Sequence, residues 1–128
     1  MLLDTTVVID LLRGRREARR RLRALRTAGD EAYVCAVNID ETVRGLLPRE
    51  YDAADRLFRG LRIARLGRHE GWRAGEWRRE HAARGLMLVQ ADCLIAAAAH
   101  SVGARLATGN PKDFPMRDIA VEHWATGA

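Results

Sequence analysis

Short apolar runs alternate with longer segments of helical periodicity along the chain, and this alternation most constrains its fold. Met1–Leu3 and Tyr33–Val37 are continuous apolar runs, typical of strands that are covered on both faces. A segment with apolar residues at helical spacing follows each of them. Strands that alternate with helices form βα units, which place the strands in a parallel sheet between helices. We therefore expect an α/β fold with a central parallel sheet of four to five short strands and helices on both faces.

The remaining elements complete this alternation. Further strands are expected at Ile63–Leu66, Arg105–Ala107 and Ile119–Val121. Helices are expected at Thr6–Arg13, Arg15–Arg26, Asn38–Leu47, Tyr51–Leu61, His69–Arg84 and Ala91–Val102. Residues 86–89 carry no decisive pattern. A chain of 128 residues without a linker or an internal repeat is the size of one domain, expected to span residues 1–128.

The chain is basic, with a formal net charge of +5 and a single lysine, Lys112. The guanidinium group of arginine binds phosphate or carboxylate bidentately, so an RNA substrate and an acidic protein partner both agree with this excess. Seven arginines lie in Arg15–Arg26 around a thin apolar stripe, which predicts an amphipathic helix with a basic outer face. Asp10 and Asp40 are interpreted as solvated or paired with arginine.

Composition also bears on the compartment. No stretch approaches the roughly 20 apolar residues that a membrane span needs, and Asp4 and Asp10 interrupt the apolar start of the chain. No signal peptide is recognisable, so a soluble, cytoplasmic protein is expected. Cys35 and Cys93 lack the spacing of a disulfide framework or a zinc site, which favours two buried, reduced thiols.

Four acidic residues occupy comparable positions, each at a strand-to-helix junction or in a loop after a strand: Asp4, Glu41, Asp92 and Asp113. In open α/β sheets, ligands bind beyond the carboxyl ends of the strands, so these residues are expected to converge. Carboxylates that converge repel one another unless their pKa values rise or a cation lies between them. Mg²⁺ or Mn²⁺ prefers such oxygen ligands, and a bound metal that polarises a phosphoryl group and activates water predicts phosphodiester hydrolysis.

Each carboxylate also has a structural explanation. Glu41 lies three residues after Asn38, which is capping-box spacing. Asp92 lies in the first turn of its helix, where the helix dipole favours an acid. Asp113 follows a turn signal and is expected in a solvated loop. Asp4 differs, because a carboxylate beside a buried strand costs several kcal/mol unless it is paired or liganded.

Four segments in order, LLDTTVVIDLLRG, VNIDETVRGL, ADCLIAAAA and LATGNPKDF, resemble the conserved blocks of PIN domains, specifically VapC-type toxins. The resemblance covers almost the whole chain. It implies that Asp4, Glu41, Asp92 and Asp113 are catalytic and hold Mg²⁺ or Mn²⁺, with Thr6, Thr108 and Asn110 in supporting roles. Two departures are Gly109, where many relatives carry arginine, and the unusually basic segment Arg15–Arg26. Both bear on substrate preference.

The resemblance also implies a biological role. It implies a cytoplasmic endoribonuclease that cleaves a structured or specific RNA. The expected partners are a cognate VapB-like antitoxin, the RNA substrate and a second copy of the toxin in a homodimer.

Particular residues bear on the alternative functions. A haloacid-dehalogenase-like Mg²⁺ phosphatase needs a second aspartate two residues after the first, where this chain has Thr6. A receiver domain needs an acidic pair near its first strand and a lysine after a late strand, and Lys112 alone does not supply this pattern. Serine-nucleophile catalysis is nearly excluded, because Ser101, the only serine, lies outside the G-x-S-x-G motif. A noncatalytic basic module that binds RNA or a protein partner remains an alternative, although Arg15–Arg26 lacks interleaved aromatic residues. Trp72 and Trp77 cannot share one helical face, so one is expected inside and the other at a partner.

Overall fold

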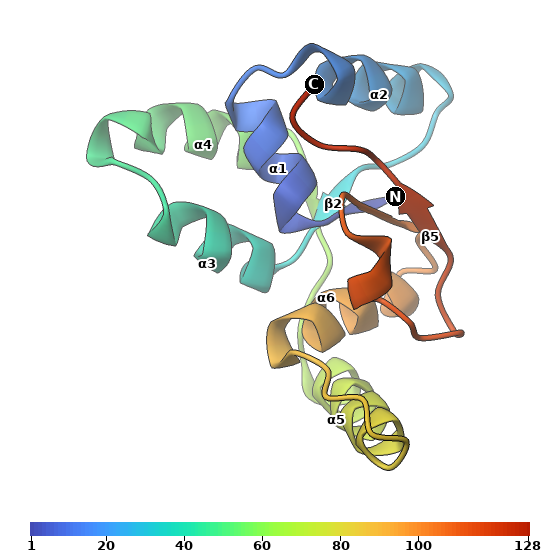
Figure 1. Ribbon diagram of the computed structural model, residues 1–128. Coiled ribbons are helices and arrows are strands. Elements are labelled where there is room, and N and C mark those ends of the chain that lie inside the picture. Colours follow the sequence, from blue (N-terminus) through green and yellow to red (C-terminus); the bar gives the residue numbers. More distant parts are fainter.

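Five short strands form one parallel sheet in the computed structural model, which describes residues 1–128 (Figure 1). The strands are β1 (Leu2–Leu3), β2 (Tyr33–Val34), β3 (Arg62–Ile63), β4 (Leu106–Thr108) and β5 (Val121–His123). Their order is β3-β2-β1-β4-β5, and every neighbouring pair is parallel. The central strand β1 pairs through Leu2 with both Tyr33 and Leu106. The expected α/β fold with a parallel sheet is confirmed.

The helices are α1 (Thr5–Leu12), α2 (Arg16–Thr27), α3 (Ala36–Arg44), α4 (Tyr51–Arg59), α5 (Arg68–Ala82) and α6 (Gln90–Ser101). Two single turns of 3₁₀ helix, η1 (Pro48–Glu50) and η2 (Pro111–Asp113), lie before α4 and after β4. Residues 86–89 form no helix or strand. No helix has both the length and the apolar character that a bilayer crossing requires.

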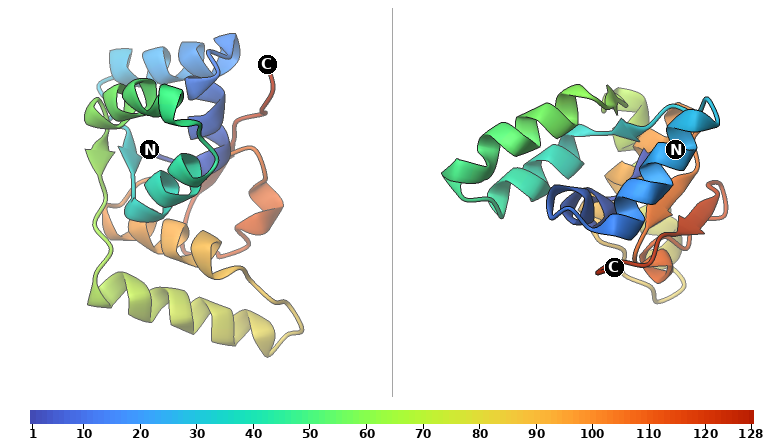
Figure 2. Two further views of the ribbon diagram at one scale, coloured as in Figure 1. Left: turned by 90° about the vertical axis from the view of Figure 1, so that its left-hand side faces the viewer. Right: turned by 90° about the horizontal axis from the view of Figure 1, so that it is seen from above.

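The sheet separates two apolar clusters because side chains alternate between its faces. Leu2 and Leu106 pack with α5 and α6 on one face, where Trp77 and the alanine run of α6 are fully buried. Leu3 and Ala107 pack with α1 and α2 on the other face. The left view of Figure 2 shows α2 and α4 above the sheet and α5 and α6 below it. Helices therefore cover both faces, as expected.

The junction between β2 and α3 differs from the prediction. The apolar run was expected to stay extended to Val37 and the helix to open at Asn38, but the strand ends at Val34 and α3 begins at Ala36. The buried Asn38 side chain accepts a hydrogen bond of 2.8 Å from the backbone N–H of Cys35, which caps the helix from within its first turn. At the other end, α3 stops at Arg44, short of the expected Leu47.

The two outer strands are also displaced from their predicted positions. β3 comprises Arg62–Ile63, and β5 comprises Val121–His123, whereas the apolar runs had favoured Ile63–Leu66 and Ile119–Val121. Both are edge strands of the sheet, and Arg62 and Ile63 are exposed. Apolar periodicity locates an edge strand poorly because fewer of its residues are buried.

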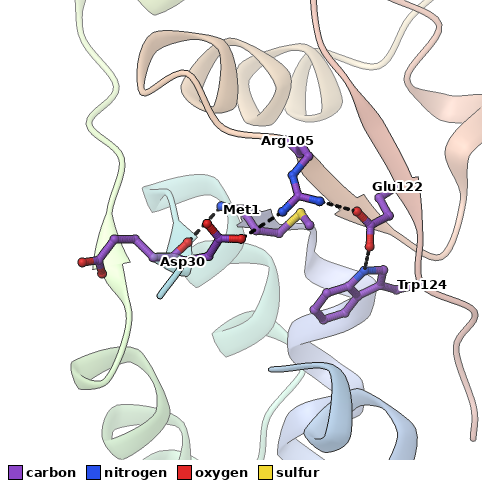
Figure 3. Close-up of polar contacts among 6 residues, drawn as sticks. Met1, Asp30, Arg105, Glu122 and Trp124 are labelled. Carbon is purple, nitrogen blue, oxygen red and sulfur yellow. Dashed lines mark hydrogen bonds and ion pairs between the residues drawn. The ribbon is translucent and has the colours of Figure 1, made fainter. Parts of the chain in front are cut away.

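Polar contacts tie the residues that precede β1 and β4 to those that precede β2, and tie Arg105 to β5 (Figure 3). Arg105 donates to Asp30 at 3.1 Å and to Glu122 at 2.7 Å, and Glu122 also accepts from the indole N–H of Trp124 at 3.0 Å. The Met1 ammonium group donates to the Glu31 carbonyl at 2.9 Å. At this edge of the sheet the carboxylates of Asp30 and Glu122 are both paired with the guanidinium group of Arg105.

The prediction that Asp10 is solvated or paired with arginine is wrong. Asp10 is 7% exposed, and its carboxylate accepts a hydrogen bond of 2.8 Å from the backbone N–H of Gly127. The Glu17 N–H donates to the carbonyl of Ala128 at 3.3 Å. These two contacts hold the segment Trp124–Ala128 across α1 and the start of α2. Asp40, in contrast, is exposed.

Candidate active site

Asp4 lies between the end of β1 and the first residue of α1, and it is 5% exposed. Its Oδ2 accepts hydrogen bonds from two hydroxyls, Thr108 Oγ1 at 2.8 Å and Thr6 Oγ1 at 3.1 Å. No protein group donates to its Oδ1, and this oxygen is not sealed off from solvent. The carboxylate is thus oriented through one oxygen while the other remains free for a ligand.

The two threonines that hold Asp4 are themselves held by backbone groups. Gly109 N–H donates to Thr6 Oγ1 at 3.0 Å, and Asn110 N–H donates to Thr108 Oγ1 at 3.0 Å. The structure therefore brings Thr6 and Thr108 to the first acid, in agreement with their expected supporting positions. Asn110 takes part through its backbone, whereas its exposed side chain makes no hydrogen bond to the protein.

Glu41 is positioned by a threonine that the sequence analysis did not single out. Thr5 Oγ1 donates to Glu41 Oε1 at 2.6 Å and accepts from Asn38 Nδ2 at 3.2 Å. The capping-box interpretation of Glu41 does not hold, because Cys35 is the N-cap and Asn38 supplies the capping side chain. Two local features of the sequence could have pointed to this contact. Asn38 and Glu41 lie about one helical turn apart, and a hydroxyl residue, Thr5, directly follows Asp4.

Asp92 and Asp113 complete the acidic group. Asp92 lies in the first turn of α6 and is partly buried, whereas Asp113 lies exposed in η2. Burial raises the pKa of Asp92 from 3.8 to about 6, and the negative charges of Asp4, Asp113 and Glu41 add to this rise. The four carboxylates, distant in sequence, therefore lie close enough to act on one another at the carboxyl edge of the sheet.

The acidic group is open as well as charged. No three His, Cys, Asp or Glu side chains lie close enough together to hold a metal ion between them. Mg²⁺ typically binds one or two carboxylates directly and keeps several waters, so an open group of oxygen ligands agrees with its chemistry. The free Asp4 Oδ1 and the charge repulsion on Asp92 both favour a dication here.

Gly109 borders this group and has no room for a side chain. A Cβ atom at this position would lie 2.6 Å from Thr126 Cγ2 and 3.4 Å from Thr6 Oγ1. The segment Trp124–Ala128 therefore packs directly against the residue whose N–H holds Thr6. The resemblance implies arginine at this position in many relatives, whereas in this chain Thr126 fills the space beside Gly109.

A groove lies between α1, α3 and α4, with Glu41 at its lining and a volume of about 570 Å³. Its apolar wall contains Ile9, Leu12, Leu46 and Ala53, and its charged lining contains Arg13, Arg49 and Glu50. Thr42, which also lines it, has the one buried side-chain oxygen in the protein without a hydrogen-bond partner. The groove is thus contiguous with the acidic group through Glu41.

Comparison with known proteins identifies the fold. The family model of the PIN domain matches residues 1–120. Among solved structures, VapBC2 from Rickettsia felis, bound to a DNA fragment from its promoter, gives a TM-score of 0.85 at 22% identity, covering 96% of this chain and 97% of that chain. The comparison with curated proteins gives no significant match.

Two further structures are similar at slightly higher identity. A toxin–antitoxin complex from Klebsiella pneumoniae gives a TM-score of 0.73 at 26% identity and covers 93% of this chain and 94% of that one. FitAcB from Neisseria gonorrhoeae gives 0.75 at 25% identity and covers 94% of each. The family suggested by the sequence resemblance is confirmed. Since the family model spans nearly the whole chain and the sheet and helices match those of the similar structures, this protein belongs to the PIN domain family.

Proposed function

We propose that this PIN domain is an Mg²⁺- or Mn²⁺-dependent endoribonuclease and the toxin of a VapBC-like toxin–antitoxin pair. PIN domains of the VapC type are nucleases as a class, and the similar structures described above are toxin–antitoxin complexes. The observation that supports this reaction is that four carboxylates lie together at one edge of the sheet. The charges of Asp4, Asp113 and Glu41, together with burial, raise the pKa of Asp92.

Within this proposal, Asp4 and Asp92 bind the metal, and Glu41 and Asp113 complete its surroundings. A bound dication supplies a Lewis acid for the scissile phosphate and lowers the pKa of a coordinated water. The protein's own contribution is orientation. Thr6 and Thr108 hold one carboxylate oxygen of Asp4 and leave the other free, and Thr5 holds one carboxylate oxygen of Glu41. These contacts hold the ligands in place before substrate arrives, which lowers the cost of ordering them.

The proposed antitoxin would occupy the groove between α1, α3 and α4. Its apolar wall suits an amphipathic segment, and its arginines suit acidic side chains on that segment. A ligand in this groove would lie beside Glu41 and could therefore block access to the acidic group. Co-purification with the product of the adjacent open reading frame, weakened by Leu12→Glu, tests this arrangement.

A homodimer of the toxin is the second proposed assembly. Trp77 is buried in the core, whereas Trp72 is 71% exposed on α5 and is the candidate contact. An exposed tryptophan is typical of an interface anchor. Light scattering of the isolated protein, with Trp72→Ala as the comparison, tests whether two copies associate.

The central experiment is cleavage of labelled RNA by Asp4→Asn and Asp92→Asn, with and without a chelator. Each substitution and the chelator should abolish cleavage while the circular dichroism spectrum persists. Asp40→Asn is the matched control, because Asp40 is exposed and lies on the same helix as Glu41. If the Asp4 or Asp92 variant still cleaves RNA, that residue is not part of the active site. Chelator-insensitive RNA binding without any cleavage would instead favour the noncatalytic module.

A further inference from the structure

The positive charge of the protein is concentrated on one helix. α2 contains six arginines and one glutamate, which gives it a net charge of +5. The formal net charge of the whole chain is also +5, so the other residues together are neutral. The basic character of the protein is therefore a property of α2 and not of its surface in general.

The arginines of α2 face outward. Ala18, Leu22 and Leu25 form the buried stripe that packs this helix on the sheet. Arg20 and Arg21 pair with Glu17, whereas Arg16, Arg19 and Arg23 are exposed and have no carboxylate partner. Residues at spacings of three and four lie on one side of a helix, so these three side chains form a row with the exposed Arg26.

Part of this row surrounds a shallow hollow of about 460 Å³. Its lining consists of Arg19, Leu22, Arg23, Arg26 and Thr27, with no acidic residue. The guanidinium group of Arg26 donates to the carbonyl of Gly60 at 2.9 Å, which fixes this side chain. Three guanidinium groups around one hollow, without a neutralising carboxylate, make an anion-binding surface.

We propose that this arginine row, Arg16, Arg19, Arg23 and Arg26, binds the phosphate backbone of the RNA substrate. The inference rests on the proposed nuclease function. Four carboxylates carry more negative charge than one bound dication neutralises, so long-range attraction for the RNA polyanion has to come from elsewhere on the molecule. The remainder of the chain has no net charge with which to supply it.

The composition of the surface favours a nucleic acid over a protein partner. Protein interfaces have an apolar or aromatic centre that is depleted in charged residues. None of the exposed large hydrophobic residues of this protein lies on α2. Trp124, whose ring centroid lies 5.9 Å from the guanidinium carbon of Arg21 on this helix, is buried. Without an exposed ring for stacking, the row recognises phosphates and not bases.

The test compares Arg19→Gln/Arg23→Gln with Arg65→Gln/Arg68→Gln, a control that removes the same charge from exposed, unpaired arginines outside α2. Binding of a fluorescent RNA is measured in chelator over a range of salt concentrations. Loss of two phosphate contacts should weaken binding roughly 10- to 30-fold near 0.1 M salt and reduce the slope of log K against log salt by about 1.5. The control variant should bind almost as wild type.

Cleavage kinetics provide a second readout. With a long RNA, the α2 variant should show a higher KM and an unchanged kcat, whereas an oligonucleotide too short to contact the acidic group and the row at once should be cut at the wild-type rate. Arg19→Lys/Arg23→Lys should retain most of the salt dependence, because lysine keeps the charge. Glutamine and lysine are both good helix formers, and a circular dichroism spectrum checks that α2 persists.

The outcomes separate this inference from the proposed function. Equal RNA affinity for the α2 variant and its control would overturn the inference even if wild type cleaves RNA. Weaker affinity for the antitoxin with unchanged RNA affinity would also overturn it and would assign the row to an acidic protein. If wild type binds but never cuts RNA, the proposed function fails, while selective loss of binding in the α2 variant would still support the row.

Discussion

Replacing Asp92 by asparagine should change how the stability of the metal-free protein depends on pH. Asp92 is partly buried and close to three other carboxylates, and its pKa is raised to about 6 in the folded state. In the unfolded chain it should return to 3.8. The folded state therefore binds this proton more tightly, and the wild-type protein loses stability as the pH rises from about 4 to 6. Asparagine has no proton to lose and avoids this loss.

The size of the effect follows from the two pKa values. The difference between 3.8 and about 6 is roughly 2 pKa units, and each unit corresponds to about 1.4 kcal/mol. Solvent screens a side chain that is only partly buried, which reduces the expected penalty to about 1–2 kcal/mol. Between pH 4 and pH 7, Asp92→Asn should therefore gain about 1–2 kcal/mol relative to wild type. For a domain of this length that corresponds to roughly 3–8 °C in Tm.

The assay is thermal and urea unfolding of wild type, Asp92→Asn and the exposed control Asp40→Asn in chelator at several pH values. The Asp40 variant should follow the wild-type pH profile. Millimolar Mg²⁺ or Mn²⁺ should then stabilise wild type at pH 7 more than Asp92→Asn, since a dication offsets the repulsion among the carboxylates. Parallel pH profiles for wild type and Asp92→Asn would show that the four acids do not act on one another, which would refute the reasoning behind the candidate site.

Three further substitutions or measurements test the surroundings of the site. Gly109→Ala should destabilise the protein by about 1–3 kcal/mol in urea unfolding because its Cβ meets Thr126, and adding Thr126→Gly should recover most of the loss. Asp10→Ala should cost about 1–3 kcal/mol because the N–H of Gly127 loses its acceptor, and Asp10→Asn should cost less, which the same assay distinguishes. Burial raises the pKa of Cys93 to about 11, so a thiol reagent at pH 8 should modify it far more slowly in the native than in the urea-unfolded protein.

Much of the fold is encoded locally. Apolar runs and helical periodicity located the interior strands and all six helices to within a few residues, because burial on both faces of a strand or on one side of a helix leaves a regular pattern. The positions of the four acids after strands predicted their convergence, because parallel strands end at one edge. Edge strands were placed less well because exposed residues carry a weaker pattern.

Contacts between distant residues depended on the tertiary structure. Thr108 and Asp4 are 104 positions apart, and Thr5 and Glu41 are 36 apart. No local pattern specifies which hydroxyl meets which carboxylate, since that depends on how neighbouring elements pack. The burial of Asp10 under Gly127 was missed for the same reason. The sequence alone determined which chemical groups gather at the edge of the sheet, and the packing of α1, α3 and β4 decided how each is oriented, because hydrogen-bond geometry is set by atoms that meet only in the folded chain.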